Sequence, residues 1–240
     1  MAVIKKGLCT IAVLLAIILH GCASSPDKTL ARKDLQSIDQ INLVRYEFPG
    51  YMKETTGSKV ASTAIAAPFM LFGAIGGGIG GGPYASVKSS MMTNAGKEMQ
   101  NKYNLPDFTG IVHKEFSERL RKDFPDWPRI IIEPNAVSDD YQNLSGCFLS
   151  IRSLVAVSDG AGLQTRTIAQ MVDSTQNVLW KKRVSYKSND LDRPCKFEQL
   201  EADNAKLLRE EIAFAVEKTV TELIGHLQNG TDTIETDSTE

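Results

Sequence analysis

The stretch CFLSIRSLVAV, residues 147–157, predicts the fold more strongly than any other part of the sequence. Apolar residues at alternate positions share one side of this stretch, as is typical of a strand with one buried face. These residues are Leu149, Ile151, Val155 and Val157. A turn-forming run, SDGAG, follows, and two more strand patterns occupy residues 163–172 and 178–187. In the last of these, Lys182 interrupts a face that is otherwise apolar. Three strands joined by short turns predict an antiparallel meander.

Helical patterns lie on both sides of this meander. From Phe108 to Phe124 an apolar residue recurs at every fourth position, with Asp107 or Thr109 as the candidate cap. A longer amphipathic pattern runs over residues 199–227, and shorter strand patterns occupy residues 41–48 and 129–133. We therefore expect an α+β domain with a mostly antiparallel sheet and two amphipathic helices packed on one face of it, the other face being solvated.

An uncharged, glycine-rich insert separates the first strand pattern from the first helix pattern. No charged residue lies between Lys59 and Lys88, and Gly73, Gly77 and Gly81 recur every four residues. On a helix this spacing leaves a groove without side chains, which lets a second helix approach closely. Three interpretations stay open: contact with a membrane, contact with another subunit, or a loop that covers the domain. The glycine spacing favours membrane or subunit contact.

The N-terminal residues have the pattern of a targeting peptide. Lys5 and Lys6 precede an apolar run of 13 residues from Gly7 to Leu19, too short for an ordinary membrane-spanning helix of about 20 residues. The run ends in Leu-His-Gly-Cys, closing at Cys22. This ending resembles the lipobox of bacterial lipoproteins, although His20 replaces the usual small or aliphatic residue.

The lipobox resemblance implies that residues 1–21 are removed and that Cys22 carries fatty acyl chains such as palmitate. Ala23 follows, where aspartate in Gram-negative lipoproteins favours retention at the inner membrane, so the resemblance implies the outer membrane. Several acyl chains would anchor the protein stably. We expect a lipidated cysteine with its tether at 22–40, a periplasmic domain at 41–227 with the insert at 60–87, and a disordered acidic tail at 228–240.

The charge composition limits the classes of partner that we expect the mature chain to bind. Without residues 1–21, which contain two lysines and no acids, the chain has 25 Lys and Arg against 29 Asp and Glu. It has no block of basic residues, so we do not expect a nucleic acid partner.

Besides the lipidated Cys22, the mature chain keeps Cys147 and Cys195. In an oxidising compartment this pair predicts a disulfide, the alternative being two buried free thiols.

The sequence contains no recognisable catalytic motif, and we predict no catalytic residue, metal site or cofactor. The element order over residues 41–227, with the run FPDW at 124–127, resembles the small domain shared by the curli secretion channel lipoprotein, activators of penicillin-binding proteins and the N-terminal part of the Tol-system β-propeller protein. This resemblance implies a non-catalytic envelope assembly or interaction scaffold, which binds an envelope protein or itself. The alternatives are an activator of a peptidoglycan synthase and a subunit of a secretion channel.

Overall fold

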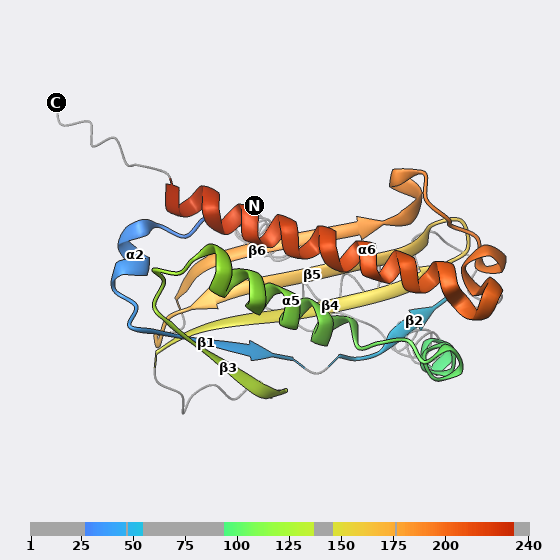
Figure 1. The fold of residues 1–240 in the computed structure, drawn as a ribbon, viewed down its shortest axis with the longest axis horizontal. Coiled ribbons are helices and arrows are strands. Elements are labelled where there is room, and N and C mark those ends of the chain that lie inside the picture. The colour runs from blue at the N-terminus through green and yellow to red at the C-terminus, as the bar shows by residue number, and fades with distance from the viewer. Residues whose placement is uncertain (1–26, 47, 55–93, 137–145, 176, 233–240) are drawn as a thin grey trace, which may run out of the picture. The chain divides into compact units, whose positions relative to one another are not determined.

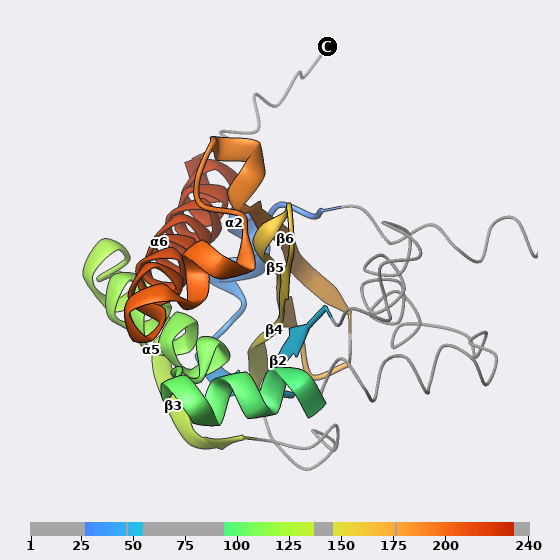
Figure 2. The same cartoon turned by 90° about the vertical axis from the view of Figure 1, so that its right-hand side faces the viewer.

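A mixed six-stranded sheet forms one layer of the domain, and helices form the other (Figures 1 and 2). The computed structural model describes residues 27–46, 48–54, 94–136, 146–175 and 177–232. The predicted signal peptide, Cys22, the glycine-rich insert and residues 233–240 of the predicted tail lie outside these residues. The tail prediction is wrong for residues 228–232, which are helical. The strands are β1 (Gln40–Arg45), β2 (Tyr51–Lys53), β3 (Arg129–Ala136), β4 (Cys147–Ser158), β5 (Gly162–Val172) and β6 (Val178–Lys187).

The strand order is β3-β1-β4-β5-β6, with β2 also paired to β4. The strands β4, β5 and β6 pair antiparallel in succession, and β1 pairs parallel with both β3 and β4. Strand β2 continues along β4 beyond β1, because β1 contacts residues 147–151 of β4 and β2 contacts residues 155–157. The strand β4 therefore holds the sheet together.

The expectation of a mostly antiparallel sheet is wrong, because three of the five strand pairings are parallel. Parallel neighbours need a crossover connection of a dozen or more residues, and β1 and β3 have one in the residues between them, which include α5 (Phe108–Asp123). The class α+β holds at the coarser level of a sheet with one helical layer.

Helices α5 and α6 (Phe197–Asp232) lie on the same side of the sheet, as Figure 2 shows from the sheet's edge. Asp107 caps α5, because its carboxylate accepts a hydrogen bond from the Gly110 amide at 2.8 Å. The core between the layers contains side chains from both helices and from β1, β4, β5 and β6. Its fully buried members include Leu43, Ile151, Trp180, Phe116 and Leu223.

The opposite face of the sheet differs from the solvated surface that alternation predicts. By strand register, Val44, Phe148, Leu154 and Ala156 point away from the helices, yet all four are buried. The basic residues Arg152, Arg166 and Arg183 share this face and are half-buried. This face is therefore amphipathic.

A left-handed turn interrupts the beginning of α6. Asp203, Asn204 and Ala205 have φ angles of 50°, 55° and 59°, a region that residues with side chains seldom adopt. The Arg209 guanidinium holds the turn by donating to the Asn204 carbonyl oxygen at 2.5 Å and to the Tyr103 carbonyl oxygen at 2.9 Å. The turn thereby joins α6 to the helical residues 94–103, which the periodicity analysis missed.

Candidate functional site

The N-terminal segment of the described chain is pinned to the edge of β6. Lys28 and Lys181 exchange backbone hydrogen bonds of 2.8 and 2.9 Å in an antiparallel bridge. The Asp27 carboxylate accepts one hydrogen bond from the Lys182 ammonium and one from the Arg183 amide, each at 2.9 Å. The Lys28 ammonium also donates to the Val178 carbonyl oxygen. We call these contacts the N-terminal clamp.

Helix α6 contacts β6 beside the clamp. The Trp180 indole N–H donates to His226 Nδ1 at 2.9 Å, which requires a neutral imidazole that carries its proton on Nε2. Nearby, the backbone of Leu30 lies close to Gly230. A Cβ atom added to Gly230 would lie 3.0 Å from both the backbone nitrogen and the backbone oxygen of Leu30. The chain segments around residues 28, 180 and 228 thus meet in one place.

Partial burial and neighbouring charges shift the pKa values of Asp27 and His226. Burial raises the pKa of Asp27, but the hydrogen bonds from Lys182 and the Arg183 amide outweigh it, so the net shift is downward. Burial lowers the pKa of His226, the Lys182 ammonium lowers it further, and Asp27 opposes both. At neutral pH this arrangement keeps Asp27 ionised and His226 neutral, the two states that the clamp's hydrogen bonds require.

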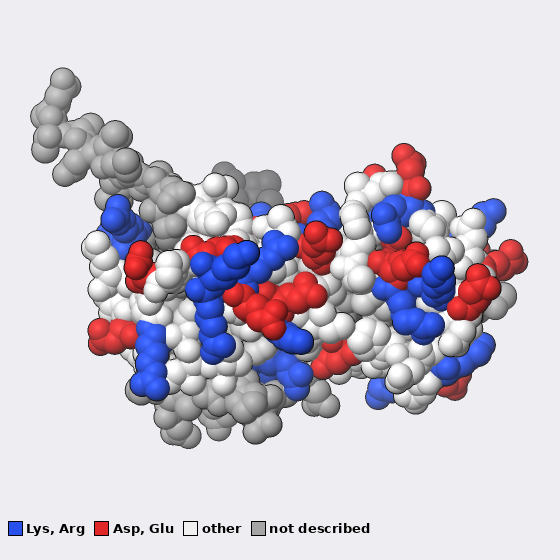
Figure 3. All heavy atoms as spheres, in the orientation of Figure 1, with Lys and Arg blue, Asp and Glu red and all other residues white. Residues whose placement is uncertain are grey.

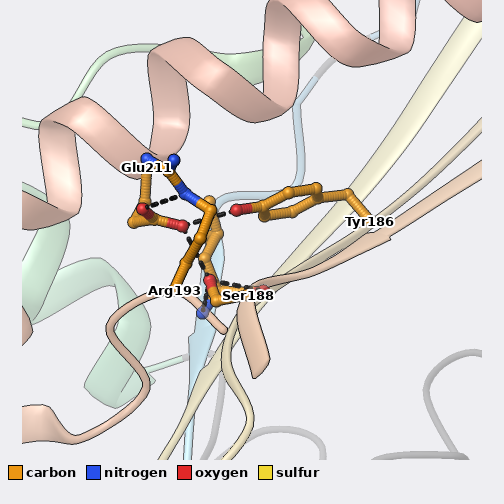
Figure 4. Close-up of polar contacts among 5 residues, drawn as sticks. Tyr186, Ser188, Arg193 and Glu211 are labelled. Carbon is orange, nitrogen blue, oxygen red and sulfur yellow. Dashed lines mark hydrogen bonds and ion pairs between the residues drawn. The ribbon is translucent and has the colours of Figure 1, made fainter. Parts of the chain in front are cut away.

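A second polar cluster lies inside the domain, where β6 turns toward α6 (Figure 4). The Glu211 carboxylate is only 1% exposed. Its Oε2 atom accepts hydrogen bonds from the hydroxyls of Tyr186 and, at 2.9 Å, Ser188, while Oε1 accepts from Arg193 Nε at 2.7 Å. Ser188 in turn accepts from the Leu163 amide at 3.1 Å.

This Glu211 cluster has the properties of an internal brace. The Arg193 guanidinium balances the buried carboxylate and stacks on the Phe214 ring, 4.1 Å from its centroid. Burial and then the hydrogen bond to Glu211 raise the pKa of Tyr186 to about 12, so its hydroxyl stays protonated at neutral pH. Each named group is thus engaged with another part of the domain, and the cluster joins β5, β6 and α6.

Of the predicted site residues, Cys22, Gly73, Gly77 and Gly81 lie outside the described part of the chain. Cys147 and Cys195 lie within it, and the predicted disulfide between them is wrong: both are free thiols. Cys147 begins β4, whereas Cys195 accepts a hydrogen bond from Gly160, just beyond the end of β4. Eleven residue steps along β4 correspond to about 36 Å, far more than the roughly 7 Å that a disulfide allows between Cα atoms.

Within the described ranges, no group of three or more His, Cys, Asp or Glu side chains could hold a metal ion. Among the same residues, none of the helices combines the length and apolar character needed to cross a membrane.

Sequence reasoning missed the clamp, although one signal for it was present. Lys182 stands between Trp180 and Val184 on the core-facing side of β6, where a charged side chain needs a partner. The partner, Asp27, is 155 residues away in the sequence, within a segment that has no periodic pattern. The identity of such a distant partner cannot be deduced from local patterning.

Comparisons with known proteins do not assign a family. No family model matches the sequence, and no curated protein matches it. One solved structure, described as a neuraminyllactose-binding hemagglutinin homolog from Helicobacter pylori, aligns with a TM-score of 0.30 and 10% identity, over 86% of this chain and 92% of that chain. A similarity at this level carries no argument about this protein.

Proposed function

We propose that this protein is a lipoprotein of the outer membrane whose periplasmic α+β domain is a non-catalytic interaction scaffold. The observation that carries the proposal is the run Leu-His-Gly-Cys ending at Cys22, behind two lysines and a short apolar stretch. In bacterial lipoproteins a cysteine in this context is acylated. The position of the domain fits an anchor at this point, because the first clamped residue, Asp27, follows Cys22 by only five positions.

The character of the domain supports a binding role more than a chemical one. Its buried polar groups, such as Glu211, Tyr186 and Arg193, pair with one another inside the domain. The meander of β4, β5 and β6 and the resemblance to the small domains of envelope lipoproteins favour the same reading.

The glycine-rich insert supports contact with a membrane or a second subunit as part of this role. Gly73, Gly77 and Gly81 would let another helix approach closely, and the uncharged residues 60–87 would be favourable in an apolar setting. We therefore expect deletion of residues 60–82 to change either lipid association or the size of the detergent-solubilised protein. An unchanged result in both measurements would remove this part of the proposal.

Metabolic labelling with a palmitate analogue tests the anchor. We expect the wild-type chain to incorporate label and to remain with outer-membrane fractions, and the Cys22→Ala variant to lose both properties. Cys195→Ala is the matched control and should behave as wild type, because that thiol lies in the folded domain. Absence of label from the wild-type chain, with unchanged location of the variant, would overturn the proposal. Crosslinking in intact cells would then identify the bound envelope protein.

A further inference from the structure

The clamp fixes which side of the domain lies near the anchor. If Cys22 is acylated, as the proposed function requires, four residues separate it from Asp27. Five extended residue steps span at most about 17 Å. Because Asp27 and Lys28 are bound to β6 by backbone and side-chain hydrogen bonds, this short tether holds the β6 edge, and not an arbitrary surface, close to the membrane.

Basic side chains outnumber acidic ones at this edge of the sheet. The segment from Asp27 to Gln36, which includes α2 (Arg32–Gln36), and the β6 residues Lys181 to Arg183 together contain six cationic and two anionic side chains, and one of each, Lys182 and Asp27, form an ion pair. Lys181 and Arg183 lie on the side of β6 away from the helices, and Lys182 lies on the helical side. We call this surface the anchor-proximal face. Burial, and then the neighbouring Arg183 guanidinium, lower the pKa of Lys181, as is expected where cations crowd together. The face is basic although the mature sequence as a whole has more acidic than basic residues.

The helical side of the domain does not show this bias. Figure 3 shows acidic and basic side chains interspersed across the helical side of the molecule. Arg32 and Lys33, in contrast, occupy successive exposed positions in α2, which lies beside the C-terminal end of α6 (Figure 1). A local excess of positive charge within reach of a bilayer is complementary to anionic headgroups, whose attraction extends over a Debye length of roughly 8–10 Å.

We propose that the anchor-proximal face lies against the membrane and binds anionic lipid headgroups. The acyl chains supply attachment, and the basic face supplies orientation: it turns the β6 edge toward the bilayer. The opposite edge of the sheet, formed by β3, then points away from the membrane and is available to partners. This inference rests on the proposed anchor but adds a lipid preference and a fixed orientation to it.

Hydrogen–deuterium exchange of the full acylated protein tests this orientation. The protein is reconstituted into vesicles of phosphatidylcholine alone or of phosphatidylcholine with 30% phosphatidylglycerol. We expect amides in residues 27–37 and 178–184 to exchange more slowly on the anionic vesicles, because the basic residues near the surface are attracted to anionic headgroups and hold these segments against the bilayer. Salt at about 0.5 M should abolish the difference.

Charge reversal supplies the matched comparison. The double variant Arg32→Glu with Lys33→Glu should lose the slower exchange, while Lys196→Glu with Lys206→Glu, exposed residues near the start of α6, should keep it. Unchanged exchange in β4 verifies that each variant is folded. Mass analysis of the N-terminal peptide separates the two possible failures. An acylated protein with equal exchange on both vesicles overturns this inference alone, whereas a protein without acyl chains overturns the proposed function and this inference with it.

Discussion

At the scale of single residues, Glu211 shows how one buried carboxylate can organise a connection. We expect Glu211→Ala to lower the free energy of unfolding by about 3–5 kcal/mol, because it leaves the hydroxyls of Tyr186 and Ser188 and the Arg193 guanidinium without their shared acceptor. Urea denaturation measures this change. Glu211→Gln, which retains one acceptor oxygen, should lose less.

The neighbouring carboxylate is the control for this prediction. Glu210 is exposed on the same helix, so Glu210→Ala should change the free energy of unfolding by no more than about 0.5 kcal/mol. Similar losses for the two alanine variants would show that the Glu211 cluster does not brace the fold.

The second residue-scale prediction concerns the hydrogen bond between Trp180 and His226. Protonation of His226 places a hydrogen on Nδ1 and removes the acceptor of the Trp180 indole. Since burial and then Lys182 lower the pKa of His226, the Trp180 indole resonance should titrate with a midpoint below the ordinary histidine value of 6.5. Two-dimensional ¹⁵N–¹H NMR follows this resonance directly.

The sign of the linked stability follows from the same shift. A histidine whose pKa is lowered by folding contributes stability above its unfolded value of 6.5, and that stability is lost as the pH falls through the folded pKa. Trp127 provides an internal reference that should not titrate with His226. A midpoint above 6.5, or a titration that persists in His226→Gln, would contradict the assigned hydrogen bond.

At the scale of helices and strands, close packing explains why residues 94–103 lie where they do. A Cβ atom at Gly96 would lie 1.7 Å from the Tyr51 carbonyl oxygen, so only glycine allows this helix to touch β2. We expect Gly96→Ala to destabilise the domain by about 2–3 kcal/mol in thermal or urea unfolding. Gly225→Ala is the control: a Cβ at that site in α6 has open space, so it should stabilise the helix by about 0.5–1 kcal/mol.

The two cysteines, at opposite ends of β4, differ in burial, and this difference leads to a prediction about their reactivity. Cys147 is 3% exposed, and burial raises the pKa of its thiol to about 12, whereas Cys195 is partly exposed beyond the other end of the strand. N-ethylmaleimide should therefore modify Cys195 in the native protein at least about a hundredfold faster than Cys147. Peptide mass mapping measures both rates, and unfolding in urea should equalise them. Recovery of a Cys147–Cys195 disulfide from the native protein would contradict the structure.

These elements also show what periodicity predicts and what it does not. The alternation at Leu149, Ile151 and Val155 and the fourfold spacing from Phe108 to Phe124 located β4 and α5 to within about one residue, since both patterns reflect burial on one side. The three-residue strand β2 is too short for a pattern of its own. The parallel pairing of β1 was missed because it joins segments about 90 to 110 residues apart, and alternation does not encode direction.

At the scale of the whole molecule, if Cys22 is acylated as proposed, the short tether should control how the domain meets the bilayer. Insertion of a flexible Gly/Ser linker of 20 residues after Pro26 would have a root-mean-square length of about 25 Å. If the anchor-proximal face binds headgroups as proposed, this insertion should weaken the slower amide exchange on anionic vesicles, because it lowers the effective concentration of the face at the surface. Exchange measurements on the reconstituted protein test this expectation.

The control for the linker is the same insertion placed after Glu240, which leaves the tether unchanged. That variant should keep wild-type exchange on anionic vesicles, and both variants should unfold at the same urea concentration. If the two insertions behave alike, the tether does not govern orientation.

The close contact between Leu30 and Gly230 has a consequence for folding during synthesis. These residues are 200 positions apart, so the segment around Leu30 acquires this neighbour only after residue 230 has been synthesised. A product that stops before the last turns of α6 lacks that neighbour and also lacks His226 beside Trp180. Such fragments leave Leu30 and Trp180, both fully buried in the folded domain, without part of their cover, so proteases should cleave them faster than a chain that contains the whole of α6.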